Sequence, residues 1–424
     1  MLRLAASALV VLVAPPLYLM LDLAVVGRLG APELAALAVA TLVLSVISTQ
    51  LTFLSYGTTA RSARAFGAGD RDRAITEGVQ ATWIALGVGA VIVVLAWLLA
   101  PWVTGALVPD ETVASDAAGW LRIAVFGVPL ILVAMAGNGW MRGVQDKRRP
   151  VYYVVIGLAV GAVLCVGLVH GMAGLPRLGL DGSAVANLVG QSITGVLFAA
   201  RLVRAAPSGL APVRSLIIAQ LRMGRDLIVR SLSFQICFIS AAAVAARFGV
   251  AQVAAHQVVL QLWEFMSLLL DSLAIAAQQL VGAALGAKTF DVARRTARSV
   301  TGTSLAVSAV LAALLAVGAG VLPRIFTSDT AVLDAITTPW WFFVAMLPIA
   351  GIVFALDGVL LGSGDAAFLR TATLAGALCA FLPMIWLSLV FDWGLAGIWT
   401  GLLAFMCTRL AAVVWRVRSG AWVR

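Results

Sequence analysis

Twelve long apolar segments, separated from one another by charged or turn-forming residues, constrain this chain more than any other feature. A helix needs about 20 mostly apolar residues to cross a bilayer core of about 30 Å. The segments are continuous runs rich in Ala, Val and Leu, whereas a membrane β-barrel needs short stretches that alternate apolar and polar residues. The predicted spans are 5–27, 35–60, 79–108, 117–141, 150–174, 182–203, 228–246, 251–285, 299–321, 336–361, 369–391 and 394–416.

The composition agrees with an all-α integral membrane protein. Of the 424 residues, 62% are hydrophobic and 11% are charged, whereas soluble globular chains have about 45–50% apolar and about 25% charged residues. Only Arg3 precedes the first apolar run, which has no small-residue cleavage site. We therefore expect this run to be the first helix and not a signal peptide.

The placement of the basic residues predicts the topology. When each Lys and Arg is assigned to the nearer end of its span, 24 of the 29 fall on one side of the membrane. The positive-inside rule makes that side cytoplasmic. We expect a multi-pass protein of the cell inner (plasma) membrane with both termini in the cytoplasm, and no nucleic-acid partner.

An internal repeat divides the chain into two halves of six spans. A constant shift of 219 residues aligns punctuating residues of the two halves, and an even number of spans makes the halves parallel. We therefore predict two parallel six-helix lobes around a central cavity, with an N-lobe at 1–205, a cytoplasmic linker at 206–220 and a C-lobe at 221–424. The aligned pairs include Gly30 with Gly249, Gly67 with Gly286, Asp110 with Asp329, Pro129 with Pro348 and Gly143 with Gly362.

Four segments resemble the multidrug and toxic compound extrusion (MATE) transporters, in particular the DinF-like branch. They are Asp22–Gly30, Arg142–Asp146 with Pro150, Val253–Gln257 with Gln261–Trp263, and Asp357–Gly362. The resemblance implies export of bulky cationic or amphipathic compounds in exchange for inward H⁺ or Na⁺, through a large cavity between two lobes.

Asp22 is the leading site residue. It is one of four carboxylates well inside predicted spans, and an ionisable group at membrane depth is by default a functional hypothesis. Loss of hydration disfavours the charged carboxylate, so a buried Asp can exchange a proton near neutral pH. The resemblance also places Asp22, Asn138 and Asn187 in an ion-coupling site, although each can instead be structural through hydrogen bonds between helices.

One departure from the family concerns the coupling ion. Where the family's fifth helix usually carries Asn and, four residues later, Asp, this chain has Gly161 and Cys165. Sodium prefers hard oxygen ligands, and a thiol is a poor substitute. We therefore expect coupling to H⁺ rather than Na⁺, with no other cofactor or metal.

The second half carries candidate substrate-binding residues. A polar stripe at helical spacing in the eighth span predicts a cavity wall, or alternatively polar contacts between the lobes or a watery passage. The repeat aligns Asp357 with Asn138, which makes Asp357 either a second titrating site or a structural cap. The candidates are Gln257, Gln261, Glu264, Asp271 and Asp357.

The leading hypothesis is a monomeric secondary antiporter in the membrane lipid, in which protonation of Asp22 biases alternating access. A flippase for lipids or lipid-linked metabolites is the alternative, and a channel or membrane scaffold is a third possibility that the duplication disfavours. No motif typical of an enzyme is present.

Overall fold

The computed structural model describes residues 2–172, 174–206 and 209–423, and these residues form helices and connecting loops without a strand. Within them, twelve helical spans are long and apolar enough to cross a membrane, which confirms the predicted fold class. The ends of the helices lie within 14 residues of the predicted ones, the largest difference being the seventh span, which begins at Arg214 and not at 228. The chain divides into two compact units, one comprising Ala6–Gly224 and the other comprising Arg225–Arg424 with Met1–Ala5.

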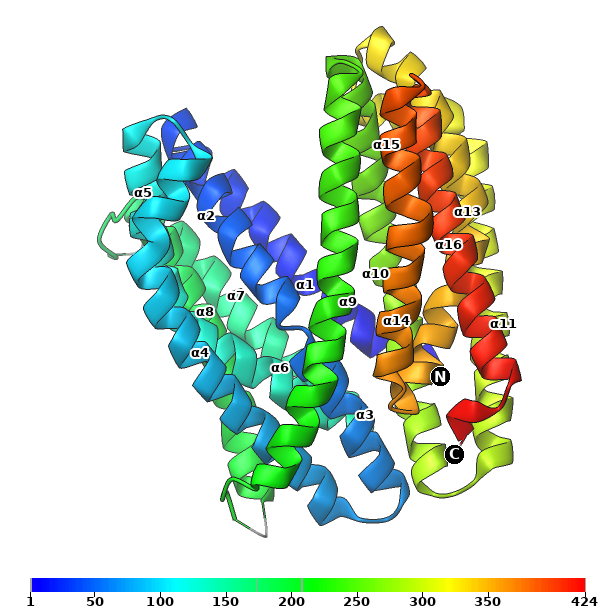
Figure 1. Ribbon diagram of the computed structural model, residues 1–424. Helices are drawn as coiled ribbons and strands as arrows, with labels where there is room; N and C mark the ends of the chain where they lie inside the picture. The colour runs from blue at the N-terminus through cyan, green and yellow to red at the C-terminus, as the bar shows by residue number, and fades with distance from the viewer. Residues whose placement is uncertain (1, 173, 207–208, 424) are drawn as a thin grey trace. The chain divides into compact units, whose positions relative to one another are not determined.

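The unit Ala6–Gly224, here the N-terminal unit, contains the first six spans (Figure 1). The second span is interrupted at Leu51, whose N–H bonds to the carbonyl of Ser48, so two helices form in its place. The fourth span is interrupted by a 3₁₀ turn at Val125–Gly127. The helices are α1 (Leu2–Val26), α2 (Ala31–Gln50), α3 (Phe53–Gly67), α4 (Arg71–Leu107), α5 (Glu111–Ala124), α6 (Val128–Gly143), α7 (Arg149–His170) and α8 (Leu180–Ala205).

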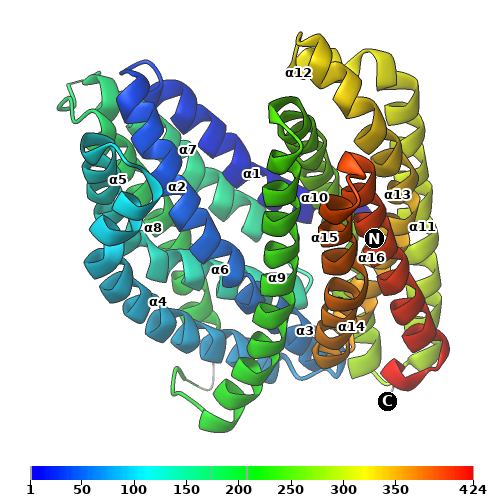
Figure 2. The same ribbon diagram turned by 45° about the horizontal axis from the view of Figure 1, so that its top comes forward.

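The other unit, here the C-terminal unit, contains the last six spans around an aromatic core. Its largest fully buried side chains include Trp340, Trp399 and Phe381. A π-helical turn at Ala377–Phe381 joins α14 to α15, so the two form one rod beside α16 (Figure 2). The helices are α9 (Arg214–Arg247), α10 (Val250–Gly286), α11 (Phe290–Val317), α12 (Leu322–Phe326), α13 (Thr330–Gly362), α14 (Ala366–Gly376), α15 (Leu382–Val390) and α16 (Gly394–Arg418).

Helix boundaries follow the 219-residue register that the sequence indicates. The starts of α2, α4 and α5 correspond at this shift to those of α10, α11 and α13, and Gly67 and Gly143 end helices as Gly286 and Gly362 do. The physical cause is local, because Asp110 and Asp329 each cap the helix that follows by accepting hydrogen bonds from two backbone N–H groups. The two halves therefore share their backbone punctuation.

Two helices contribute residues to both units. Leu4 and Ala5, at the beginning of α1, pack against Leu273 and Ala276 of the C-terminal unit, to which they belong. The first turns of α9 belong in turn to the N-terminal unit, where Gly224 lies directly against the ring of Phe53. Leu4 and Ala5 correspond to Met223 and Gly224 at the shift of 219, so the arrangement is reciprocal.

The predicted linker 206–220 includes the start of α9, which begins at Arg214. The loop before α9 is attached to α4, because the side chain of Gln80 bonds to the backbone of Ala211 and Val213. Deeper in the unit, the buried Glu77 accepts two hydrogen bonds of 2.7 Å from Arg61 and one of 2.7 Å from Gln220. This network fixes the beginning of α9 to α3 and α4.

Candidate functional site

A cavity of about 340 Å³ lies within the N-terminal unit, and five of its helices together with α1 supply the walls. Most of the lining is apolar, and a few polar groups converge on it, which is the usual composition of a small-molecule site. The polar lining residues are Tyr18, Asp22, Thr41, Ser45, Ser48, Thr52, Ser55, Tyr56, Asn138, Arg142, Asn187, Gln191 and Thr194.

Asp22 is fully buried in the wall of this cavity. The thiol of Cys165 on α7 lies 3.2 Å from its Oδ1 and donates a hydrogen bond. Its Oδ2 has no hydrogen-bond partner of standard geometry among the described residues, although the hydroxyl of Ser183 lies close enough to interact with the carboxylate. A carboxylate with so few donors and no cation paired to it among the described side chains is poorly compensated in its charged form.

Asn138 and Asn187 line the same cavity from α6 and α8. The structure therefore brings together the three residues that the sequence assigned to ion coupling. Asn138 is 8% exposed, and its Oδ1 has no partner within the described part of the chain. An unsatisfied buried amide oxygen is costly, and such a group in a cavity is available to a ligand.

Two further polar side chains belong to the cavity and were not singled out from the sequence. Tyr18 lies one helical turn before Asp22 and is buried, and its hydroxyl has no hydrogen-bond partner among the residues described. Arg142 is 7% exposed and lies 3.4 Å from the hydroxyl of Ser55. The i,i+4 spacing of Tyr18 and Asp22 was a usable signal, whereas Arg142 had been interpreted only as a marker of topology.

The absence of a side chain at Gly161 has a packing cause. A Cβ atom there would lie 3.2 Å from Cε2 of Tyr18 and 3.3 Å from the carbonyl of Ala186. The neighbouring Gly190 approaches α7 equally closely, since its Cβ would lie 3.1 Å from the Cα of Gly161. Small residues allow this close helix contact, and it leaves no room for the Asn that the family usually has.

The predicted polar stripe lies along α10 and changes in exposure along its length. Gln257, Gln261 and Glu264 are exposed, Asp271 is half-buried and Gln278 is buried. The stripe is thus a feature of one helix of the C-terminal unit, and its predicted role in binding substrate stays a prediction.

Asp357 is in a different environment from its counterpart Asn138. It is 5% exposed, and its Oδ2 accepts a hydrogen bond of 2.5 Å from Arg230 of α9 and another from Arg409 of α16. The sequence had assigned both arginines to the cytoplasmic side as topology markers, and it gave no signal of their pairing with Asp357. Its predicted part in substrate binding stays a prediction, on which this pairing bears.

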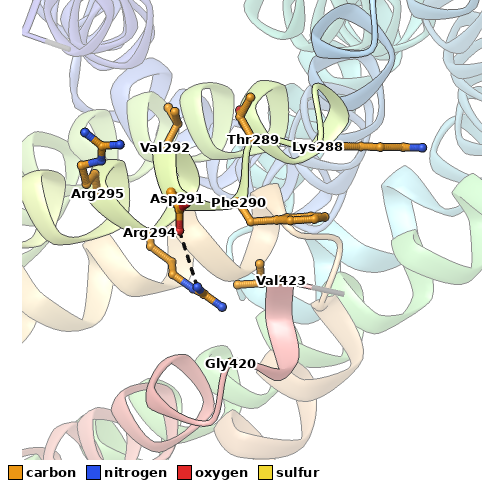
Figure 3. Close-up of a pocket in the computed structure, with 9 residues that line it drawn as sticks. All are labelled: Lys288, Thr289, Phe290, Asp291, Val292, Arg294, Arg295, Gly420 and Val423. Carbon is orange, nitrogen blue, oxygen red and sulfur yellow. Dashed lines mark ion pairs between the residues drawn. The ribbon is translucent and has the colours of Figure 1, made fainter.

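A hollow of about 700 Å³ near the C-terminus is lined by the basic residues Lys288, Arg294 and Arg295 (Figure 3). Arg294 points toward Asp291, with which it forms a long ion pair of 3.7 Å. Lys288 and Arg295 extend in opposite directions away from it (Figure 3). Because these cations do not converge, the hollow lacks the arrangement of a binding site.

Comparisons with known proteins agree with this architecture. The model of the MatE family matches residues 8–166 and 227–386, one match in each half. The chain is 30% identical to "Protein DETOXIFICATION 44, chloroplastic" of Arabidopsis thaliana, over 99% of this chain and 82% of that protein. It is 28% identical to "DNA damage-inducible protein F" of Escherichia coli (strain K12), over 96% of this chain and 90% of that one.

Solved structures show the same fold. The chain aligns with "Crystal structure of MATE in the bent conformation" with a TM-score of 0.89 and 21% identity, covering 99% of this chain and 95% of that one. It aligns with "Outward-facing conformation of a multidrug resistance MATE family transporter of the MOP superfamily" with a TM-score of 0.87 and the same identity and coverage. The chain belongs to the MatE family of multidrug and toxic compound extrusion transporters, so it is a multi-pass membrane transporter of small molecules and not an enzyme.

Proposed function

We propose that the protein is a proton-coupled antiporter that exports bulky cationic or amphipathic compounds. The observation that carries this proposal is the fully buried Asp22 carboxylate in the wall of a cavity that also contains Asn138 and Asn187. Protonation removes the charge of Asp22, so it changes the relative stability of the inward-open and outward-open states. Proton entry then drives substrate exit by alternating access.

The donor set around Asp22 favours H⁺ over Na⁺. A sodium ion would need several hard oxygens, yet the nearest side chain on α7 is the thiol of Cys165, at 3.2 Å. Gly161 cannot supply a further oxygen because it has no side chain. A proton needs only one basic atom, and the unpartnered Oδ2 of Asp22 offers one.

The polar stripe on α10 is proposed to contact substrate. Its exposed members Gln257, Gln261 and Glu264, together with Asp271, offer amide and carboxylate oxygens that suit an organic cation. Asp357 was predicted with them, but its two guanidinium partners make it a weaker candidate. The relatives with "multidrug resistance" in their names support a broad range of substrates.

The proposal also covers the cellular setting. The excess of Lys and Arg on one side supports a plasma membrane protein with both termini in the cytoplasm. One chain contains two six-span halves, which supports function as a monomer.

Inverted membrane vesicles test the proposal. An imposed proton gradient should drive accumulation of a fluorescent organic cation by the wild type, and Asp22→Asn should reduce it by about tenfold or more, because the variant cannot lose its proton. Asp116→Asn is the matched control, since Asp116 is an exposed carboxylate of the same unit. Wild-type transport in Asp22→Asn, at equal amounts of folded protein, would refute the role of Asp22.

The coupling ion is tested separately by varying sodium and pH independently in the same vesicles. Proton coupling predicts that transport follows the pH gradient and does not respond to a sodium gradient at constant pH. Transport driven by sodium alone would contradict the proposed ion but not the proposed site.

A further inference from the structure

The environment of Asp357 combines a buried carboxylate with aromatic rings around one guanidinium. Arg409 is 3% exposed and bonds to Oδ2 of Asp357. The Cζ atom of Arg409 lies 4.9 Å from the centre of the Phe234 ring and 5.7 Å from that of Phe405. A carboxylate and aromatic faces are the groups that proteins use to bind organic cations.

The internal repeat places this cluster at the counterpart of the N-terminal cavity. At the shifts of 219 and 215 residues that align the halves, Asp357 corresponds to Asn138, Phe234 to Pro15 and Arg409 to Thr194. All three counterparts line the cavity of about 340 Å³. Small or neutral residues in the N-terminal unit are thus matched by large or charged ones in the C-terminal unit.

The remaining contacts show how tightly Arg409 is enclosed. The ring of Phe405 stacks on Phe381 with centres 5.6 Å apart and meets Phe234 edge-on at 5.5 Å. Arg230 bonds to the same carboxylate oxygen and is itself 5.8 Å from the Phe234 ring. Burial of a guanidinium in such surroundings is favourable only with good pairing, which Asp357 and the rings supply.

We propose that the C-terminal unit contains an organic-cation site formed by Asp357, Phe234 and Phe405, and that the guanidinium of Arg409 permanently occupies it. The chain carries its own ligand at this position, so a free cation has no access to Asp357 in the wild-type protein. A shortened side chain at 409 exposes the site to alkylguanidinium ions. This inference concerns binding alone and does not rest on the proposed antiport.

Chemical rescue of Arg409→Ala tests the site. The variant lacks the atoms of ethylguanidinium, so this cation fits the space that is created. In the purified protein, Arg409→Ala should lower Tm, and millimolar ethylguanidinium should raise the Tm of the variant by about 2 °C or more while leaving the wild type unchanged. Ethylurea, which has the same shape and no charge, should have no effect.

Three controls isolate the site. Arg409→Ala combined with Asp357→Asn should lose the rescue, because the carboxylate is gone. Arg409→Met should not respond, because its side chain fills the space. Arg416→Ala is the matched control, since Arg416 bonds to Asp365 at 2.6 Å and lies 5.1 Å from the ring of Phe368, but its side chain is 27% exposed; solvent already reaches that pair, so ethylguanidinium should not raise its Tm.

Two results would overturn the proposal. One is an equal effect of ethylguanidinium on the wild type, Arg409→Ala and Arg416→Ala, which would indicate a general action on the protein. The other is the absence of rescue in folded Arg409→Ala, or failure to obtain folded Arg409→Ala even when ethylguanidinium is present throughout purification. A rescue confined to Arg409→Ala supports the site.

Discussion

The thiol of Cys165 donates a hydrogen bond to Oδ1 of Asp22 across 3.2 Å, and this contact joins α7 to α1. Both residues are fully buried. A thiol is a weak donor, so it orients the carboxylate without supplying the hard oxygens that a metal cation requires. The identity of residue 165 therefore bears directly on which ion can share the site with Asp22.

Cys165→Asp should make transport responsive to sodium. The variant places two hard oxygens beside Asp22, which suits Na⁺ better than sulfur does. Accumulation of a fluorescent cation in inverted vesicles, with a sodium gradient at constant pH, measures the change. Cys165→Ser is the control, because its hydroxyl keeps a donor to Asp22 and adds only one oxygen; sodium-independent transport in Cys165→Asp would contradict this account of selectivity.

Asn138→Leu should separate stability from transport. The unpartnered Oδ1 of Asn138 is buried at a cost, so an apolar side chain of similar size should leave Tm unchanged or raise it, by up to about 1 kcal/mol of stability. Transport should fall by about tenfold because the cavity loses an amide. Gln220→Leu offers the contrast, since Gln220 makes two hydrogen bonds to Glu77 and its loss should lower Tm. A large decrease in the Tm of Asn138→Leu would show that this amide is structural.

Gly157→Ala should destabilise the contact between α7 and α8. A Cβ atom at residue 157 would overlap Oγ1 of Thr194 and lie 2.6 Å from the carbonyl of Gly190, and such overpacking costs about 1–3 kcal/mol. Gly87→Ala in α4 is the matched control, because a Cβ there meets nothing within 4 Å. That variant should be neutral or slightly stabilising, since Ala favours a helix. Thermal unfolding of the two purified variants checks the difference, and equal Tm values would argue against the close packing of α7 and α8.

Glu77→Ala should lower stability far more than removal of an exposed carboxylate. Glu77 is 2% exposed and holds Arg61 and Gln220, and removal of one partner of a buried pair costs about 3–5 kcal/mol. Asp146→Ala removes the partner of Arg149, whose side chain is 50% exposed, and should cost at most about 1 kcal/mol. Denaturation in detergent compares the two, and a small effect of Glu77→Ala would mean that the network is not needed to hold α9.

Much of the fold could be predicted because its determinants are local. Continuous apolar runs fix the spans, and the capping residues Asp110 and Asp329 mark helix starts at the same register in both halves. The grouping of Asp22, Asn138 and Asn187 was also predictable, through resemblance to the family. These features depend on neighbours in sequence or on aligned positions.

The rest of the site depends on contacts between distant segments. Proximity to span ends placed Arg230 and Arg409 at the cytoplasmic side, yet both pair with Asp357. The thiol contact of Cys165 with Asp22 joins residues of α7 and α1 that no sequence spacing relates. The helix start at Arg214 was missed because its polar side chains were assigned to a linker, whereas Gln220 is buried against Glu77.

The exchange of first turns between the two units sets an order for the assembly of the chain. Leu4 and Ala5 pack against Leu273 and Ala276, which are synthesised more than half a chain later. The beginning of the protein therefore leaves the ribosome without its partner, whereas Gln220 and Gly224 emerge when Glu77 and Phe53 are already in place. The second half can dock on the first during synthesis, and the N-terminal turn of α1 is completed only after α10 has been made.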